Sequence, residues 1–164
     1  MTNSRNFSSV MEAALYGAEG FYERAGGGAG RRGDFLTAPE VGPLFGAVVA
    51  RAVDAWSEEL GRPDGFTVYD VGAGPGTLGR SLALAGSPYP YVAVDRSAVQ
   101  RARHEGLESA AELPDGPLVG VVVANELLDN LPFDLTRDGR PFDPAGDWPE
   151  IGLAPESGTA RALV

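Results

Sequence analysis

The chain has 164 residues, 43% of them hydrophobic, and a formal net charge of −10. This length suits about one domain with its own core, and the negative charge argues against nucleic acid as a general partner, because phosphates are repelled. The sequence has no cysteine and one histidine, His104, which excludes disulfides, thiolate zinc sites and polyhistidine metal sites. It shows neither an apolar run long enough for a membrane span nor a secretory signal, so we expect a soluble cytoplasmic protein without a membrane partner.

Two amphipathic helices are predicted in the first 65 residues. Apolar residues recur at helical spacing over residues 8–17, and Ser8 or Ser9 is expected to cap this helix. The segment that follows carries glycines at positions 26–28, 30 and 33, which favours a loop that serves either as a connector or as a lid over a ligand. A second helix is expected over residues 44–60, with an apolar face formed by Leu44, Val48, Ala52, Ala55 and Trp56.

Strands then alternate with helices, which is typical of an α/β sheet with right-handed crossovers. The expected elements are strands over residues 66–71, 91–95 and 118–125, a helix from Thr77, and a helix over residues 97–113 that breaks near Gly106. The third strand is a continuous apolar run, so we expect it to be a central strand that is covered on both faces.

The pattern changes after Pro132. Residues 134–143 predict a β-hairpin around Asp138 and Gly139, and the residues beyond it predict one or two further short strands. We therefore divide the chain into an N-terminal helical segment with its glycine-rich loop, an α/β core and a hairpin extension, over residues 1–65, 66–134 and 135–164.

The stretch VYDVGAGPGTLG, residues 68–79, forms a glycine-rich turn behind the first strand, and two interpretations of it differ in the ligand. In the first, Gly74 to Gly79 form a GxGxxG motif, and Asp95 follows Gly74 by 21 residues. That spacing is typical of a dinucleotide fold, in which the acidic residue binds the adenosine ribose. This interpretation predicts a nicotinamide-dependent oxidoreductase.

In the second interpretation the motif begins at Asp70, two residues before Gly72. A carboxylate at that position would repel a pyrophosphate, whereas it would attract a cationic ligand without phosphate, such as S-adenosylmethionine. Asp95 would then accept hydrogen bonds from the two ribose hydroxyls. We favour this interpretation because of Asp70, although Asp70 could instead be a loop or capping residue and Asp95 a helix N-cap.

The third predicted strand ends in Asn125, Glu126 and, three residues further on, Asp129. Ligands of open α/β sheets bind at the carboxyl ends of the strands, so we expect these side chains beside the glycine turn. Paired carboxylates can hold a guanidinium or remove a proton from a nucleophile before methyl transfer. The structural alternative is that Asn125 or Glu126 caps the next turn and Asp129 faces solvent.

Several motifs together resemble one family. They are MEAALYGAEGFYE (residues 11–23), GDFLTAPEVGPLFG (33–46), YDVGAGPGTL (69–78) and ANELLDNLPFD (124–134). These stretches resemble the MidA-like class I S-adenosylmethionine-dependent methyltransferases, relatives of the mitochondrial complex I assembly methyltransferase. The resemblance runs in order from about Met11 to Trp148, and the second and fourth motifs are its more specific parts.

The resemblance implies a Rossmann-like class I methyltransferase fold with N-terminal helices and a C-terminal hairpin, and S-adenosyl-L-methionine as cofactor. It also implies a methyl acceptor such as a protein arginine, which the mitochondrial relative modifies. Further matches to the family's loop over the cofactor are Gly33, Asp34 and Pro39, and Pro132 matches its fourth motif. We assign methyl transfer to Glu126 and Asp129, and cofactor binding to Thr37, Glu40, Asp70, Gly72, Ala73, Gly74, Gly76, Thr77, Asp95 and Asn125.

The sequence departs from that family in one respect, since family members are usually about twice as long. The further strands that complete their sheet find no match here, so we expect an incomplete sheet whose edge is covered by a partner or by self-association. A truncated enzyme, half of a split enzyme and a reduced domain all stay open. The predicted function is a methyltransferase or its cofactor-binding half, with a non-catalytic assembly domain and an NAD-dependent oxidoreductase as alternatives.

Overall fold

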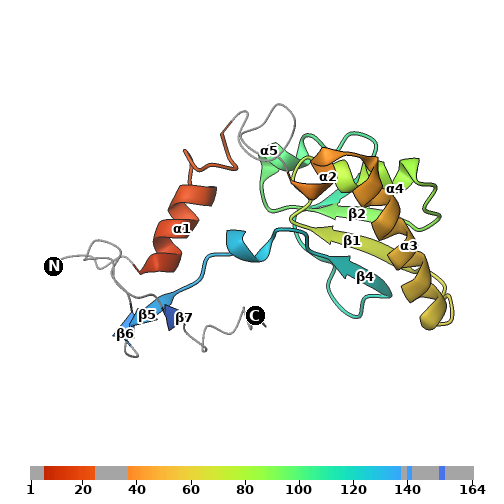
Figure 1. Cartoon of the computed structure of the whole chain (residues 1–164). Coiled ribbons are helices and arrows are strands. Elements are labelled where there is room, and N and C mark those ends of the chain that lie inside the picture. Colours follow the sequence, from red (N-terminus) through yellow and green to blue (C-terminus); the bar gives the residue numbers. More distant parts are fainter. Residues whose placement is uncertain (1–5, 25–36, 138–139, 142–151, 154–164) are drawn as a thin grey trace.

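A computed structural model describes residues 6–24, 37–137, 140–141 and 152–153 (Figure 1). It contains a parallel sheet with helices packed on it, and a small antiparallel sheet beside the N-terminal helix. The helices are α1 (Phe7–Tyr16), α2 (Ala38–Val41), α3 (Pro43–Glu59), α4 (Thr77–Leu84), α5 (Ala98–Arg101) and the 3-10 turn η1 (Leu128–Asn130). The strands are β1 (Thr67–Val71), β2 (Tyr91–Val94), β3 (Glu108–Ala110), β4 (Gly120–Val123), β5 (Leu135–Arg137), β6 (Arg140–Pro141) and β7 (Gly152–Leu153).

The parallel sheet has the strand order β3-β2-β1-β4, which confirms the Rossmann-like fold class. β1 pairs with β2 on one side and with β4 on the other, β2 also pairs with β3, and all three pairings are parallel. After β1 the chain continues to β2 and β3 on one side of β1, and it then returns to form β4 on the other side of β1. The carboxyl ends of β1 and β4 form a switch point of the kind at which open α/β sheets bind ligands.

One face of the sheet packs against α3 and α4 (Figure 1). The core on this face joins Val53 of α3, Val68 of β1 and Leu82 of α4, each of which is almost fully buried. The two helices approach closely where Gly46 of α3 meets Ser81 of α4, since a Cβ on Gly46 would overlap Ser81. The helices predicted over residues 44–60 and from Thr77 are thereby confirmed.

The expected helix over residues 97–113 is wrong beyond its first turn. Only α5 forms, and residues 108–110 are β3, an edge strand that pairs with β2. Ser97 caps α5 by accepting a hydrogen bond from Gln100 N–H, and α5 ends at Arg101. Gly106, with a positive φ of 77°, lies in the turn that leads into β3. Pairing with β2 thus overrides the weak helical pattern of this polar segment.

Two predicted apolar faces also differ from the structure. β4 is not a central strand, because within the described residues it pairs only with β1, and Val122 is 48% exposed. On α3 the buried positions include Gly46 and Val53, whereas the predicted apolar face is largely exposed, with Leu44 at 76%. A helical period fixes which residues share a face but not which face is buried, and here small residues allow the closer packing.

The N-terminal helix packs against the segment that follows η1. Asn6, and neither Ser8 nor Ser9, is its N-cap, and its side chain accepts a hydrogen bond from Ser9 N–H at 3.3 Å. Asp134 accepts a second one from Ser8 N–H at 3.1 Å. Hydrogen bonding from the Ser8 side chain, with smaller contributions from this N–H and from Asn6, lowers the Asp134 pKa below its ordinary value. The contact between Ser8 and Asp134 joins residues that lie 126 positions apart.

The predicted hairpin is supported by the antiparallel pairing of β5 with β6, and β7 adds one further short strand. Asp138, Gly139 and the glycines at 26–28, 30 and 33, with Asp34, lie outside the described residues. No helix in the described part of the chain has the length and apolar character needed to cross a membrane. The proposed division at residues 65 and 134 stays a prediction.

Gly46→Ala should destabilise the fold by about 1–3 kcal/mol, because the added methyl group would overlap Ser81 at the α3–α4 crossing. Urea unfolding followed by circular dichroism measures this loss. Gly42→Ala is the matched control, since its φ of 165° suits any residue and a Cβ there meets no atom within 4 Å. Equal stability of the two variants would contradict the described helix packing.

Candidate functional site

A cavity of about 640 Å³ lies at the carboxyl ends of β1, β2 and β4. The N-terminal segment forms its opposite wall through Leu15, Tyr16, Phe21 and Tyr22. Of the twelve residues assigned from the sequence, Gly76 is not in the lining. The other eleven line the cavity: Thr37, Glu40, Asp70, Gly72, Ala73, Gly74, Thr77, Asp95, Asn125, Glu126 and Asp129.

The glycine turn runs from the end of β1 to the start of α4. Gly72 has a φ of +75°, and a Cβ there would lie 2.8 Å from the Leu127 side chain, so the position has little tolerance for any other residue. Gly76, with a φ of +78°, is the N-cap of α4. The glycine turn therefore packs against the segment after β4 at Gly72 and leads directly into α4 at Gly76.

Every N–H between residues 72 and 76 has an acceptor within the fold. Gly72 and Ala73 both donate to the Val94 carbonyl, at 2.8 and 3.1 Å, and Gly76 donates to the Ala73 carbonyl at 2.9 Å. Gly74 donates to Asp95 Oδ2 at 2.9 Å, while Pro75 has no N–H. A dinucleotide turn offers its N–H groups to a pyrophosphate, so this turn disfavours the oxidoreductase interpretation.

Asp70 is a buried carboxylate at the base of the cavity, only 3% exposed. Burial raises its pKa to about 6, with a smaller contribution from the charge of Asp95, whereas a hydrogen bond donated by the Tyr91 hydroxyl lowers the pKa. The Tyr91 ring fits beneath α4 because residue 79 is glycine, where a Cβ would lie 2.7 Å from the ring's Cζ. Asp70 is therefore held from inside the fold and is not a loop residue.

Asp95 follows β2 and faces the glycine turn. Its Oδ2 accepts from Gly74 N–H and its Oδ1 from Ser97 N–H, each at 2.9 Å. Burial raises the pKa of Asp95, and these two backbone hydrogen bonds oppose that rise. Because Ser97 is the residue that caps α5, the alternative role of Asp95 as the N-cap is wrong.

Glu126 and Asp129 approach the cavity from the segment after β4. Glu126 is exposed and has a φ of +53°. Its Oε1 accepts a hydrogen bond from the Ala38 N–H at the start of α2, at 3.4 Å. The Asn130 amide donates to the Glu126 carbonyl at 2.9 Å and to Asp129 Oδ1 at 3.3 Å. Non-glycine residues seldom adopt a positive φ, so the conformation of Glu126 marks a functional candidate.

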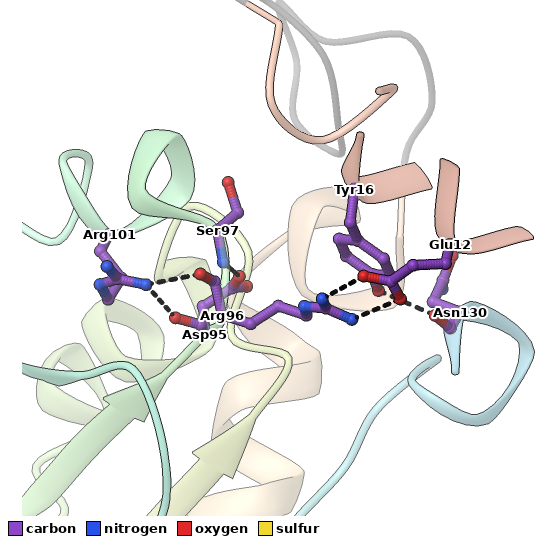
Figure 2. A network of polar contacts seen from close by, with 7 residues as sticks. All are labelled: Glu12, Tyr16, Asp95, Arg96, Ser97, Arg101 and Asn130. Atoms are coloured by element: carbon purple, nitrogen blue, oxygen red, sulfur yellow. Dashed lines mark hydrogen bonds and ion pairs between the residues drawn. The ribbon is translucent and has the colours of Figure 1, made fainter. Parts of the chain in front are cut away.

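Sequence reasoning did not assign the residues that close the cavity on the N-terminal side (Figure 2). The hydroxyls of Tyr16 and Tyr22 donate to the carbonyl and side-chain oxygens of Asn130, both at 2.8 Å. Arg96 extends from the end of β2 to Glu12 of α1, with which it pairs, and its guanidinium lies 4.0 Å from the centre of the Tyr16 ring. The one sequence feature that pointed to these residues is the tyrosine-containing motif at residues 11–23.

The hydroxyls of Tyr16 and Tyr22 lie close enough to carboxylates of the cavity for these charges to raise their pKa values. Burial, with smaller contributions from Tyr16 and from the negative charges of Asp129, Asp95 and Glu126, raises the Tyr22 pKa to about 12. Burial likewise raises the pKa of Tyr16, where the positive charge of Arg96 opposes the shift. The cavity therefore combines neutral aromatic hydroxyls with several carboxylates and favours a ligand that carries positive charge.

Comparisons with known proteins identify the family. A family model described as "Putative S-adenosyl-L-methionine-dependent methyltransferase" matches residues 48–158, about two thirds of the chain. The chain therefore belongs to this S-adenosyl-L-methionine-dependent methyltransferase family, which confirms the resemblance found in the motifs. The match covers β1, the glycine turn and the segment after β4.

Relatives agree with this assignment. Over 53 residues the chain is 38% identical to the mitochondrial protein arginine methyltransferase NDUFAF7 homolog of Drosophila melanogaster, covering 32% of this chain and 12% of the relative. A crystal structure of a "likely methyl transferase" from Burkholderia thailandensis, bound to S-adenosyl-homocysteine, is 33% identical over 80% of this chain, with a TM-score of 0.68. An uncharacterized protein of the same superfamily and organism is 34% identical over 78%, with a TM-score of 0.59.

The matched part is a fraction of each relative. This chain covers 38% and 36% of the two solved structures and about one eighth of the curated relative.

Asp70→Asn should stabilise the protein above pH 6 by about 1–3 kcal/mol and leave it nearly unchanged below pH 4. The folded chain binds the Asp70 proton more tightly than the unfolded chain does, so the wild type loses stability as the pH rises from about 4 to about 6. Asparagine cannot ionise and can still accept from Tyr91. Urea unfolding of both proteins at pH 4 and pH 7.5 measures the difference, and an equal difference at both pH values would contradict the burial penalty.

Proposed function

We propose that this chain binds S-adenosyl-L-methionine in the cavity at the carboxyl ends of β1, β2 and β4 and takes part in methyl transfer from it. The observation that carries the proposal is the glycine turn, whose N–H groups between residues 72 and 76 all have acceptors within the fold. Asp70 and Asp95 lie beside this turn as two buried or half-buried carboxylates. Such a site suits a cationic ligand without phosphate.

The residues present fit this cofactor. A cavity of about 640 Å³ is large enough for a nucleoside with an amino-acid arm. Asp95 has lone pairs left beyond its two backbone hydrogen bonds, and these would accept from the ribose hydroxyls. Asp70 would supply negative charge for the ammonium group, while Thr37, Glu40 and Asn125 line the remaining surface. When bound, the cofactor supplies an activated methyl group on a sulfonium.

We assign the chemical step to Glu126 and Asp129, which line the same cavity. Their carboxylates would orient the methyl acceptor and take the proton that its nucleophilic nitrogen loses. A protein arginine is the acceptor we propose, in parallel with the name of the Drosophila relative, because paired carboxylates suit a guanidinium. A cytoplasmic location and a partner or second copy that covers the β4 edge stay predictions.

Calorimetric titration tests the cofactor assignment. We expect saturable binding of S-adenosylmethionine and S-adenosylhomocysteine and none of NAD. Gly74→Asp should weaken this binding at least 100-fold, because the side chain would enter space that the cofactor needs; a Cβ there meets no protein atom within 4 Å, although the φ of +55° strains any residue other than glycine. Gly86→Asp is the matched control, since this glycine also has a positive φ and open space but lies just beyond α4, outside the cavity lining. NAD binding, or equal affinity of both variants, would refute the assignment.

Glu126→Gln should lower the rate of methyl transfer about 100-fold and leave the Kd for S-adenosylhomocysteine unchanged, because an amide can accept from Ala38 N–H but cannot take a proton. Transfer to arginine-containing protein with a radiolabelled methyl donor gives the rate. Glu58→Gln, at an exposed position of α3, serves as the control. Loss of binding and rate together would exclude the proposed role, and cofactor binding by the wild type without any transfer would favour the non-catalytic alternative.

A further inference from the structure

Gly74 is held in a different way from its neighbours in the glycine turn. Gly72 and Gly76 are enclosed by side chains. A Cβ on Gly72 would lie 2.8 Å from the Leu127 side chain, and a Cβ on Gly76 would lie 2.7 Å from the Leu107 side chain. A Cβ on Gly74 would meet no atom within 4 Å. Glycine is also the residue with the most conformational freedom, so the position of Gly74 depends on its hydrogen bonds.

Two side chains make those hydrogen bonds, one on each side of the residue. Asp95 Oδ2 accepts from the Gly74 N–H at 2.9 Å, and His104 Nε2 lies 2.7 Å from the Gly74 carbonyl oxygen. A carbonyl can only accept, so His104 must carry its proton on Nε2 and donate it. Both polar groups of the Gly74 backbone are thus fixed from within the fold.

His104 itself is held firmly for this contact. It is only 4% exposed, and its Nδ1 lies 2.8 Å from the hydroxyl of Ser109 on β3. In the neutral imidazole that Nδ1 accepts the Ser109 hydrogen, which fixes the ring's tautomer and orientation. The ring also lies under the next part of the turn, since a Cβ on Gly76 would be 3.2 Å from His104 Cδ2.

We propose that His104 is a positioning residue that holds Gly74, and with it the glycine turn, in the conformation that the cofactor binds. His104 does not line the cavity, whereas Asp95 does. Asp95 is the residue assigned to the ribose, so its carboxylate would serve both the turn and the ligand. The contact from His104 stays the same in the free and bound states, and it fixes the turn before binding, which lowers the entropic cost of association.

This inference rests on the proposed cofactor site, and two substitutions of His104 test it. The amide nitrogen of glutamine lies as many bonds from the backbone as His104 Nε2, and that of asparagine as many as Nδ1. His104→Gln should therefore keep the donor to Gly74 and bind S-adenosylhomocysteine within about threefold of the wild type. His104→Asn should lose that donor and bind about tenfold more weakly, because a buried carbonyl is left unpaired.

Calorimetry gives the Kd, and thermal unfolding of each variant shows whether a change in affinity merely follows a change in stability. Wild-type affinity in His104→Asn, or equal weakening in both variants, would overturn the proposal. Amide hydrogen exchange of residues 72–76 without ligand provides a readout that does not need the cofactor. Exchange should be faster in His104→Asn and unchanged in His104→Gln, and equal exchange in both would also overturn it.

Two further measurements separate the possible failures. If the wild type binds no S-adenosylhomocysteine, the proposed function fails, while the exchange data still decide whether His104 holds the turn. If His104→Asn does not fold, the nitrogen chemical shifts of the wild-type imidazole decide between the tautomers. Protonation on Nε2 supports the proposal, and a neutral ring protonated on Nδ1 refutes it.

Discussion

The hydrogen bonds that tie the glycine turn to the end of β2 are the constraint on which the rest of the site depends. The Val94 carbonyl accepts from Gly72 and Ala73, and Asp95 accepts from Gly74, so the turn is closed against the neighbouring strand. These bonds exist only because β1 and β2 pair in register, with Val71 opposite Val94. The same pairing brings Asp70 and Asp95 to one cavity and consumes the N–H groups that a phosphate would need.

The buried carboxylate of Asp70 costs stability at neutral pH. Its pKa of about 6 means that the folded protein must ionise a group that is only 3% exposed and that accepts a hydrogen bond from the Tyr91 hydroxyl. A neutral residue at this position would remove that cost, and groups with strongly shifted pKa values gather at functional sites. We interpret the retained charge as the physical basis for preferring a cationic cofactor.

Local patterns predicted the part of the fold that carries the glycine turn. The apolar run of β1, the glycines and the start of α4 at Thr77 lie within about twenty residues, and each has its own signal. The edge strand β3 was missed because its three residues, Glu108 to Ala110, show no strand pattern of their own and pair only with β2. The buried face of α3 was assigned wrongly because close packing at Gly46 decides it.

The supporting residues of the site could not be predicted for the same reason. His104 reaches Gly74 across 30 residues, and Tyr16 and Tyr22 reach Asn130 across more than 100. A lone histidine has no motif, and the motif at residues 11–23 does not indicate what its tyrosines contact. These roles emerge only once the fold brings distant segments together. The acidic and glycine residues were found because their spacing along the chain is itself informative.

A crystal structure of this chain with S-adenosylhomocysteine tests the central claim most directly. We expect the ribose hydroxyls to lie within hydrogen-bond distance of the Asp95 carboxylate. We also expect Gly72, Ala73 and Gly74 to keep their bonds to Val94 and Asp95. Binding elsewhere, or a turn that opens and donates these N–H groups to the ligand, would contradict it.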